Sequence, residues 1–405
     1  MKILIVCQYY PPEPFRVGDL ARGLHERGHQ VTVLTGFPNY PQGKLYKGFS
    51  LRLFRQDNDH GVTVWRVPLF PDTSFNRLKR ILNYVSFFLS ASLIGPFLVG
   101  CRYDAILTFQ LSPVSMAIPS VIIRALSGFR IPIYHWVQDI WPESLEAAGL
   151  KTNPKVVGLL RKLVSFLYHQ SEKVLIQSEG FRNLVLSYGI ASSRIEYLPN
   201  WAEDLYQPLN PDIEFAKKES MGEGFHVVFA GNIGAAQGLE TVIDAAKLLQ
   251  SHSDIRFIII GDGANLENLK SYARDVSNVE LKGRKNLELM PTYFALADVL
   301  LVHLKRDPLF ALTIPSKVQS YLACGRVVVA GLQGSGSEVI NESEGGIVCE
   351  PENPQALCDA ILKVYKMPIA ERQKMSQNAL NYYSTHFSRN LVLDKLQQIL
   401  KRGSV

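Results

Sequence analysis

Short apolar segments rich in Val, Ile and Leu recur along the chain in two successive series, and stretches with helical spacing separate them. Such segments are apolar throughout because a parallel strand in an α/β sheet is covered by helices on both faces. The first series comprises residues 2–7, 29–34, 62–67, 105–109, 131–137, 174–177 and 195–198. The second comprises residues 225–230, 255–260, 279–281, 299–303, 327–330 and 346–348. The pattern predicts two Rossmann-like, doubly wound α/β domains.

The boundary between the two predicted domains falls near residue 200. A chain of 405 residues exceeds what one core usually serves, and a polar stretch with several prolines, 199–211, separates the two series. We therefore expect one domain at 1–200 and a second at 201–385, with a C-terminal helix at about 386–405 that packs back on the first. Two such domains imply a cleft between them, where small-molecule sites prefer to form.

The basic charge of the chain lies in its first half. Residues 1–200 carry 22 Lys and Arg against 13 Asp and Glu, whereas residues 201–405 carry 21 against 24. This asymmetry favours an anionic partner for the first domain, such as a lipid surface or a phosphorylated acceptor, although scattered surface charges give the same total. No nucleic-acid partner is expected.

Residues 81–101 carry no charge, and Arg77, Lys79 and Arg80 precede them. The length of this stretch permits a membrane span. Four Asn and Ser residues interrupt its apolar surface, however, and a strand-like segment follows directly, which argues against a span. Two interpretations then stay open for residues 77–101, namely a helix buried in the domain and a helix in the membrane interface, with its basic residues toward anionic headgroups.

Neither the cysteines nor the clustered acids indicate a metal site. The five cysteines lack metal-ligand spacing and are expected to be reduced residues of a cytoplasmic protein. Asp57 and Asp59 form an acid pair in what we interpret as a polar turn before a strand. We therefore expect neither a metal ion nor another cofactor.

Glycine-bearing loops follow the first three predicted strands of the second half. Gly231-Asn232-Ile233-Gly234 follows the first strand, Gly261-Asp262-Gly263 the second, and Gly283-Arg284 the third. Glycines at these places let backbone N–H groups approach a ligand. Pro315 to Gly325 forms a predicted helix whose first residues, Ser316 and Lys317, offer an anion site at its positive end. Together the loops indicate a nucleotide site, with phosphates toward 231–234 and 316–317 and the nucleoside toward 261–284.

These motifs resemble those of the two-domain GT-B glycosyltransferases of family 4, over essentially the whole chain. The resemblance is carried by segments 9–13, 27–35, 261–263, 297–299 and 322–325. Segments 35–41, 138–143, 231–234 and 315–317 look like the subgroup that builds bacterial surface polysaccharides and includes N-acetyl-L-fucosamine transferases. The resemblance implies retention of anomeric configuration and a nucleotide-sugar donor.

The chain departs from the family pattern in its donor site. The family usually has two glutamates eight residues apart, where this chain has Leu312 and Ser320, and an arginine and a lysine on the first loop, where it has Asn232 and Gln237. Another cation must then stabilise the departing diphosphate. Lys317 is our main candidate, Arg306 and Lys305 are the alternatives, and the alternative role for Lys317 is that of a solvated helix residue.

Candidate site residues follow from this comparison. For the diphosphate they are Gly231, Asn232, Gly234, Ser316, Lys317 and Arg306. For the nucleoside they are Gly261, Asp262, Gly263, Gly283 and Arg284. For the acceptor they are Arg16, Gly18 and Glu143. Lys317 and Asp139 are the catalytic candidates; Asp139 follows an apolar strand and either activates the acceptor hydroxyl, binds the sugar or caps the next helix.

We accordingly expect a cytoplasmic, peripherally membrane-associated glycosyltransferase. It would move an N-acetylated sugar, with a 6-deoxy sugar as one option, from a UDP donor to a lipid-diphosphate-linked acceptor. Two alternatives remain. One is a nucleotide-sugar epimerase on the same fold. The other is a non-catalytic sugar-nucleotide-binding subunit, which the absence of the two family glutamates supports.

Overall fold

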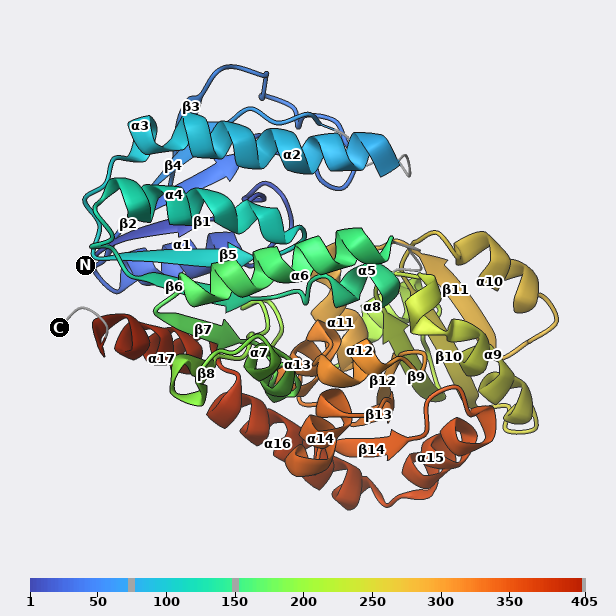
Figure 1. Cartoon of the computed structure of the whole chain (residues 1–405). Coiled ribbons are helices and arrows are strands. Elements are labelled where there is room, and N and C mark those ends of the chain that lie inside the picture. The colour runs from blue at the N-terminus through green and yellow to red at the C-terminus, as the bar shows by residue number, and fades with distance from the viewer. Residues whose placement is uncertain (72–76, 148–152, 403–405) are drawn as a thin grey trace. The chain divides into compact units, whose positions relative to one another are not determined.

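A computed structural model of the chain describes residues 1–71, 77–147 and 153–402. The chain divides into two compact units, each built on one sheet (Figure 1). Unit 1 comprises Met1–Leu198 together with the C-terminal residues from Leu393, and unit 2 comprises Pro199–Val392. The prediction of two Rossmann-like α/β domains is confirmed.

The sheet of unit 1 has eight strands in the order β3-β4-β2-β1-β5-β6-β7-β8, and all neighbours except β3 and β4 are parallel. The strands are β1 (Lys2–Val6), β2 (Gln30–Gly36), β3 (Arg55–Asp59), β4 (Val62–Val67), β5 (Ala105–Gln110), β6 (Ile133–Val137), β7 (Lys173–Ile176) and β8 (Ile195–Tyr197). The helices are α1 (Val17–Glu26), α2 (Arg77–Leu93), α3 (Gly95–Val99), α4 (Ile118–Leu126), α5 (Glu143–Ala147), α6 (Pro154–His169), α7 (Arg182–Ser187) and, from Leu393 onward, α17 (Arg389–Arg402).

The register of the central strands brings their carboxyl ends to one edge of the sheet. Val6 at the end of β1 pairs with Leu34 of β2 and with Thr108 of β5. The loops that follow β1, β5 and β6 therefore meet at this edge, which is where open α/β sheets bind ligands. Arg16, Gly18 and Asp139 all lie on these loops or at the start of the next helix.

The polar turn predicted at residues 57–59 is wrong, because these residues belong to the edge strand β3. The turn lies at His60 and Gly61, both with positive φ, and Asp59 pairs with Val62 across it. Asp57 accepts hydrogen bonds from Arg55 (2.7 Å) and Arg66 (2.8 Å). The strand escaped prediction because its polar side chains lack the apolar alternation of a half-buried strand.

The sheet of unit 2 is parallel throughout, in the order β11-β10-β9-β12-β13-β14. Its strands are β9 (Phe225–Ala230), β10 (Ile255–Ile260), β11 (Val279–Gly283), β12 (Val299–His303), β13 (Val328–Gly331) and β14 (Gly346–Cys349). Its helices are α8 (Ile213–Lys218), α9 (Leu239–Leu248), α10 (Leu266–Tyr272), α11 (Met290–Ala295), α12 (Pro308–Leu312), α13 (Ser316–Ala323), α14 (Ser335–Ser343), α15 (Pro354–Lys366) and α16 (Ile369–His386).

Alternate residues of the strands in unit 2 enter two separate apolar cores. Val227 and Phe229 of β9 pack in one core with residues of α9 and α15, whereas Val228 and Ala230 pack in the other with residues of α11, α13 and α14. Burial on both faces explains why these strands are continuously apolar. The predicted helix at 315–325 is confirmed as α13, and it ends before Gly325, whose φ is +59°.

Helix α17 is anchored on unit 1 from two sides. Arg27 at the end of α1 forms an ion pair with Asp394 (3.0 Å), and the Tyr134 hydroxyl of β6 donates to the carbonyl of Leu400 (3.2 Å). The helix corresponds to the one predicted at about 386–405, of which residues 403–405 lie outside the described part of the chain.

Candidate functional site

The loop after β9 begins at Gly231, and the side chain of Lys317 lies directly over this glycine. A Cβ atom at Gly231 would be 2.4 Å from Cε and 3.0 Å from Nζ of Lys317. A side chain at Gly231 would displace the end of the lysine, and the φ of Gly231, +147°, favours glycine. The start of α13 thus supplies a cation to the loop after β9.

The Lys317 amine has a largely apolar environment. Its Nζ donates a hydrogen bond to Oε1 of Gln237 (2.5 Å) and lies 3.9 Å from the centroid of the Phe229 ring. Burial lowers the pKa of Lys317 to about 7, since desolvation disfavours the charged amine. Within the described residues no carboxylate neutralises this amine, so an anionic ligand would be its natural partner.

The three glycine loops of unit 2 pack on one another. The N–H of Ile233 donates to the carbonyl of Asp262 (2.8 Å), and a Cβ atom at Gly261 would lie only 1.8 Å from the carbonyl oxygen of Gly231. Gly263 likewise packs on the backbone of Ile233. Close approach between loops therefore explains the glycines at 261 and 263 without a ligand, and their predicted nucleoside role stays a prediction.

The other predicted donor residues lie around this loop cluster. Gly283 accepts the N–H of Gly261 (2.9 Å). Gly234 lies beside the side-chain amide of Asn232. Four of the predicted donor-site residues are exposed, namely Asn232, Asp262, Arg284 and Ser316. The cluster of 231–234, 261–263 and Lys317 is thus brought together at the carboxyl ends of β9 and β10.

Arg306 is engaged elsewhere. Its guanidinium pairs with Glu350 (2.7 Å) and donates to the carbonyl of Pro351 (3.1 Å). The exposed Lys305 lies closer to the loop, because its N–H donates to the carbonyl of Ala236 (2.9 Å). Arg306 would have to leave its carboxylate partner to reach a diphosphate.

His303, at the end of β12, positions the partner of Lys317. Its Nδ1 lies 2.7 Å from the carbonyl oxygen of Gln237, and its Nε2 lies 3.1 Å from the backbone nitrogen of Glu352. The imidazole therefore donates from Nδ1 and accepts at Nε2, as the neutral form does, and burial lowers its pKa. A histidine at a strand end was the only sign of this role in the sequence.

In unit 1, Asp139 lies at the end of β6 with its carboxylate held by neighbours. Oδ2 accepts from the Ser112 hydroxyl and from Nε1 of Trp141 (3.2 Å). Burial raises the pKa of Asp139, and the Ser112 hydrogen bond opposes this shift. Ser112 and Trp141 were not predicted as site residues, although each follows or adjoins a predicted strand end.

A buried polar chain supports the Asp139 backbone. Gln110 at the end of β5 donates to the carbonyl of Asp139 (2.7 Å) and contacts Nε2 of His135 (3.0 Å). His135 is buried within β6, and burial lowers its pKa to about 3. It is therefore a neutral core histidine that fixes Gln110.

The three predicted acceptor residues have different surroundings. Glu143, the first residue of α5, pairs with the exposed Arg161 (3.3 Å). Arg16 directly precedes α1. Gly18 is buried, and a Cβ atom there would lie 2.2 Å from the Pro11 ring, so packing already requires glycine.

Glu13 joins two loops at the same edge of the sheet. Its carboxylate accepts the N–H groups of Tyr10 (3.0 Å), Asn39 (2.9 Å) and Tyr40 (2.8 Å). Burial raises its pKa to about 7, and the three N–H donors oppose that shift. In the sequence Glu13 stands out only as part of a motif, and this positioning role was not predicted.

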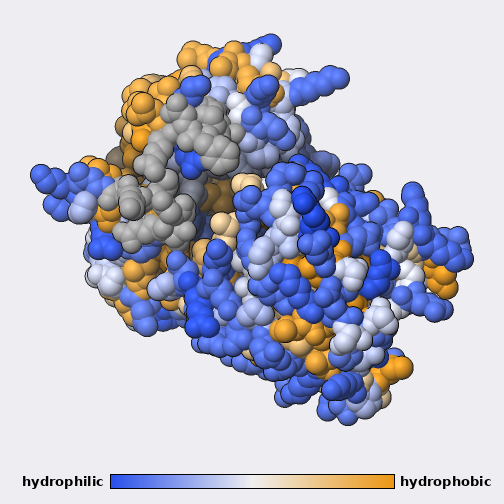
Figure 2. Space-filling view, turned by 90° about the vertical axis from the view of Figure 1, so that its right-hand side faces the viewer, coloured by the Kyte–Doolittle hydropathy of each residue, from blue (hydrophilic) through white to orange (hydrophobic). Residues whose placement is uncertain are grey.

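The charge-free segment forms α2 and α3 and exposes its apolar residues. Outward-facing side chains recur at helical spacing and are Leu78, Ile81, Leu82, Leu89, Leu93 and Phe97. Phe97 is 89% exposed and Leu78 77%. Figure 2 shows hydrophobic residues gathered at the upper left, in the region that α2 occupies at the top of Figure 1.

Two polar residues of α2, Asn83 and Ser90, face inward instead, on the same side as the buried Phe87 and Ala91. Asn83 is buried, accepts from Nε2 of Gln8 (2.8 Å) and donates to the carbonyl of Phe70 (2.6 Å). The Ser90 hydroxyl donates to the carbonyl of Pro68 (2.5 Å). Within residues 1–71, 77–147 and 153–402, no helix is both long and apolar enough to cross a bilayer.

Comparison with known families accounts for most of the chain. The family described as "Glycosyl transferase 4-like domain" matches residues 15–201, and the family "Glycosyl transferases group 1" matches residues 211–382. Both matches are to glycosyltransferase families and together they cover most of the chain, which is therefore a glycosyltransferase. The first match falls on unit 1 and the second on unit 2, so the glycine loops and Lys317 lie in the group 1 region.

Two relatives match this glycosyltransferase over most of their length. It is 27% identical to a protein of Escherichia coli K12 named "Putative colanic acid biosynthesis glycosyl transferase WcaI", over 95% of this chain and 98% of the relative. It is also 27% identical to the "Probable glycosyltransferase WbjE" of Pseudomonas aeruginosa, over 78% of this chain and 80% of the relative.

A solved structure shares the fold of this glycosyltransferase. The crystal structure of Anabaena Alr3699/HepE, in complex with UDP and glucose, superposes with a TM-score of 0.69 at 17% identity and covers 99% of each chain. The GT-B fold expected from the sequence is thereby confirmed. The subgroup that includes N-acetyl-L-fucosamine transferases stays a prediction.

Proposed function

We propose that this glycosyltransferase transfers a sugar from a UDP donor to a lipid-diphosphate-linked acceptor, with retention, in the synthesis of a bacterial surface polysaccharide. The observation that carries the proposal is the Lys317 amine, which lies over Gly231 and has no neutralising carboxylate among the described residues. This is the cation that a departing diphosphate needs, in a chain that lacks the usual arginine and lysine of the first loop.

The donor and the acceptor are proposed to bind different units. The loop cluster of unit 2 would hold UDP, with Lys317, Ser316 and the backbone of 231–234 at the diphosphate and 261–263 with 283–284 at the nucleoside. The E. coli relative, described as a colanic acid biosynthesis transferase, supports a polysaccharide product. The Anabaena structure, solved with UDP and glucose, supports a UDP donor. We propose an N-acetylated sugar as the transferred group, and N-acetyl-L-fucosamine is the first to test. The proposal involves no metal ion.

In unit 1, the proposed catalytic residue is Asp139, with Arg16, Gly18 and Glu143 toward the acceptor. No covalent nucleophile is invoked. The acceptor hydroxyl would attack on the face that the diphosphate leaves, so that the leaving diphosphate takes up the proton while Lys317 stabilises its charge. Asp139 would orient or activate that hydroxyl.

Turnover that depends on both substrates is the expected result for the purified chain. UDP release from a panel of UDP-sugars should be seen only when a synthetic lipid-diphosphate sugar is present. Conversion of the donor without acceptor would instead indicate the epimerase, and donor binding with no turnover across a broad panel would indicate the binding subunit. Either of these results would contradict the proposed transfer.

We also propose that α2 and α3 place the protein at the inner face of the bacterial membrane. Their outward leucines and Phe97 form an apolar stripe, whereas the inward Asn83 and Ser90 are bonded to the protein. A surface helix of a soluble protein usually presents polar residues outward, so the exposed leucines are what distinguishes α2. Lys79 and Arg80 at the start of α2, and the basic excess of residues 1–200, suit anionic headgroups.

The double variant Leu82→Glu/Leu89→Glu is expected to bind lipid vesicles about tenfold or more weakly than wild type, because two apolar side chains no longer enter the interface. Vesicle co-sedimentation measures this. The matched control is Leu248→Glu/Leu287→Glu on unit 2, whose leucines are 49% and 50% exposed against 46% for both Leu82 and Leu89. Equal loss in both double variants, or no loss in the first, would contradict a role for α2.

A further inference from the structure

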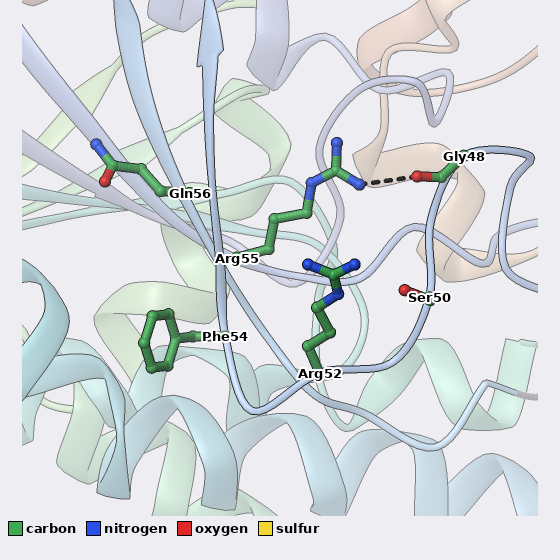
Figure 3. Close-up of a pocket in the computed structure, with 6 residues that line it drawn as sticks. All are labelled: Gly48, Ser50, Arg52, Phe54, Arg55 and Gln56. Atoms are coloured by element: carbon green, nitrogen blue, oxygen red, sulfur yellow. Dashed lines mark hydrogen bonds between the residues drawn. The ribbon is translucent and has the colours of Figure 1, made fainter.

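A pocket of about 520 Å³ lies on unit 1 where the chain enters the edge strand β3. Its lining residues are Gly48, Ser50, Arg52, Phe54, Arg55 and Gln56. Figure 3 shows the guanidinium groups of Arg52 and Arg55 on the side of Gly48 and Ser50, while Phe54 and Gln56 point away from them. Two cations therefore share one side of an open pocket.

Positively charged groups outnumber carboxylates around this pocket. Arg55 donates to the carbonyl of Gly48 (2.8 Å) and pairs with Asp57 (2.7 Å). Asp57 also pairs with the buried Arg66 (2.8 Å), so one carboxylate serves two guanidinium groups. Arg52 adds a further positive charge, and among the described residues it has neither an ion-pair nor a hydrogen-bond partner. An anion with several oxygens, such as a phosphate, fits this arrangement.

The surroundings of Arg52 are apolar and exposed. Leu51, Leu53 and Phe54 are 49%, 66% and 47% exposed, next to Arg52 in the sequence. Residues 43–56 contain Lys44, Lys47, Arg52 and Arg55 but no Asp or Glu. Large apolar side chains interleaved with cations are typical of a surface that enters a bilayer interface, where the cations meet lipid phosphates.

We propose that this pocket binds the phosphate of an anionic phospholipid headgroup, with Arg52 and Arg55 as its ligands and Leu51, Leu53 and Phe54 in the interface. The occupant is taken to be a lipid because the apolar side chains flank the cation on both sides, which a site for free phosphate does not need. The proposal rests on the membrane association proposed above and adds to it a defined site for the headgroup phosphate. It leaves the donor and acceptor sites unchanged.

The test compares vesicles of phosphatidylcholine alone with vesicles that also contain phosphatidylglycerol, using the full chain. Arg52→Gln is expected to weaken binding to the anionic vesicles about fivefold, from roughly 1 kcal/mol per basic residue near an anionic surface. Binding to phosphatidylcholine vesicles and turnover with a soluble acceptor analogue should stay unchanged. Arg274→Gln, which removes an exposed arginine of unit 2, is the matched control and should bind as wild type does.

Several outcomes would overturn the proposal. Unchanged binding of Arg52→Gln to anionic vesicles would do so, as would the same loss in Arg274→Gln. A thermal shift by inorganic phosphate that depends on Arg52, without any effect on vesicles, would make the pocket a site for free phosphate. Loss of a co-purifying protein instead of vesicle binding would make it a protein-docking surface. If wild type binds no vesicles at all while sugar transfer proceeds, the membrane proposals fail and the transfer function stands.

Discussion

Lys317→Ala should turn over a UDP-sugar about 10²-fold or more slowly than wild type, because the loss of one preorganised cation at a developing charge has an effect of this size. The amine is placed for this role by Gly231 below it and by Gln237, which accepts its hydrogen bond. Steady-state kinetics with saturating donor and acceptor measure the change. The effect should fall on kcat, since the diphosphate gains charge as the glycosidic bond breaks.

Proton uptake on UDP binding is an independent test of whether the Lys317 amine contacts the diphosphate. Burial lowers the pKa of Lys317 to about 7 in the free protein, and a diphosphate beside it would raise that pKa. Below pH 7 the amine is already charged, so binding takes up no proton there. Above pH 7 binding takes up close to one proton, and the Kd for UDP rises about tenfold per pH unit until the pKa of the complex is reached. Calorimetry in buffers of different ionisation enthalpy measures this uptake.

Lys305→Ala is the matched control for both measurements. Lys305 is exposed and adjoins the same loop through its backbone, so its loss removes a nearby charge without disturbing the amine over Gly231. We expect rates within a few-fold of wild type and an unchanged proton uptake. Near-normal turnover of Lys317→Ala would contradict our assignment and would transfer the role to Lys305, Arg306 or the backbone alone.

The parallel strands could be predicted from the sequence because burial on both faces leaves a continuous apolar run, as in residues 225–230 and 255–260. The edge strand β3 could not, since its residues are polar on both faces and are held by ion pairs such as Asp57 with Arg66. The two-residue turn at His60-Gly61 is the remaining signal for this strand in the sequence.

Helix α2 shows why its orientation could not be predicted. The sequence correctly indicated a charge-free helical stretch, and its polar residues were interpreted as interruptions of an apolar surface. Helical periodicity separates Asn83 and Ser90 from Leu82 and Leu89, but the period is the same whichever face meets the sheet. Only the partners of Asn83, which follow β1 and β4 in the chain, decide that the face with Asn83 and Ser90 is the inner one.

The candidate donor site was predictable in its loops but not in its contacts. Strand ends followed by glycines indicated where a ligand could approach, and the start of α13 indicated a cation. The contact between Lys317 and Gly231 joins segments distant in the sequence, and it depends on how α13 packs against β9. The same holds for His303 and Gln237, because a hydrogen bond to a backbone carbonyl leaves no trace in residue type.

Asp139→Asn is expected to lower kcat by about 10²-fold or more, because a carboxylate that positions or deprotonates a hydroxyl loses its charge while keeping its size. The amide introduced by this substitution would retain an oxygen for the Ser112 hydroxyl and for Nε1 of Trp141, so the fold should persist. Chemical denaturation alongside the kinetics separates the two roles. A lower free energy of unfolding with near-normal turnover would show that Asp139 only anchors the start of α5.

The Ser112→Ala variant tests the charge of Asp139 without removing it. The Ser112 hydrogen bond holds the pKa of the buried carboxyl down, so its loss should raise that pKa further. If ionised Asp139 assists the reaction, the acid limb of the pH–rate profile then moves to higher pH, while the rate on the plateau falls by less than tenfold. An acid limb that stays in place in Ser112→Ala, together with a slow Asp139→Asn, would assign Asp139 to acceptor binding instead of proton transfer, because a group that only binds the sugar does not set the pH dependence of kcat.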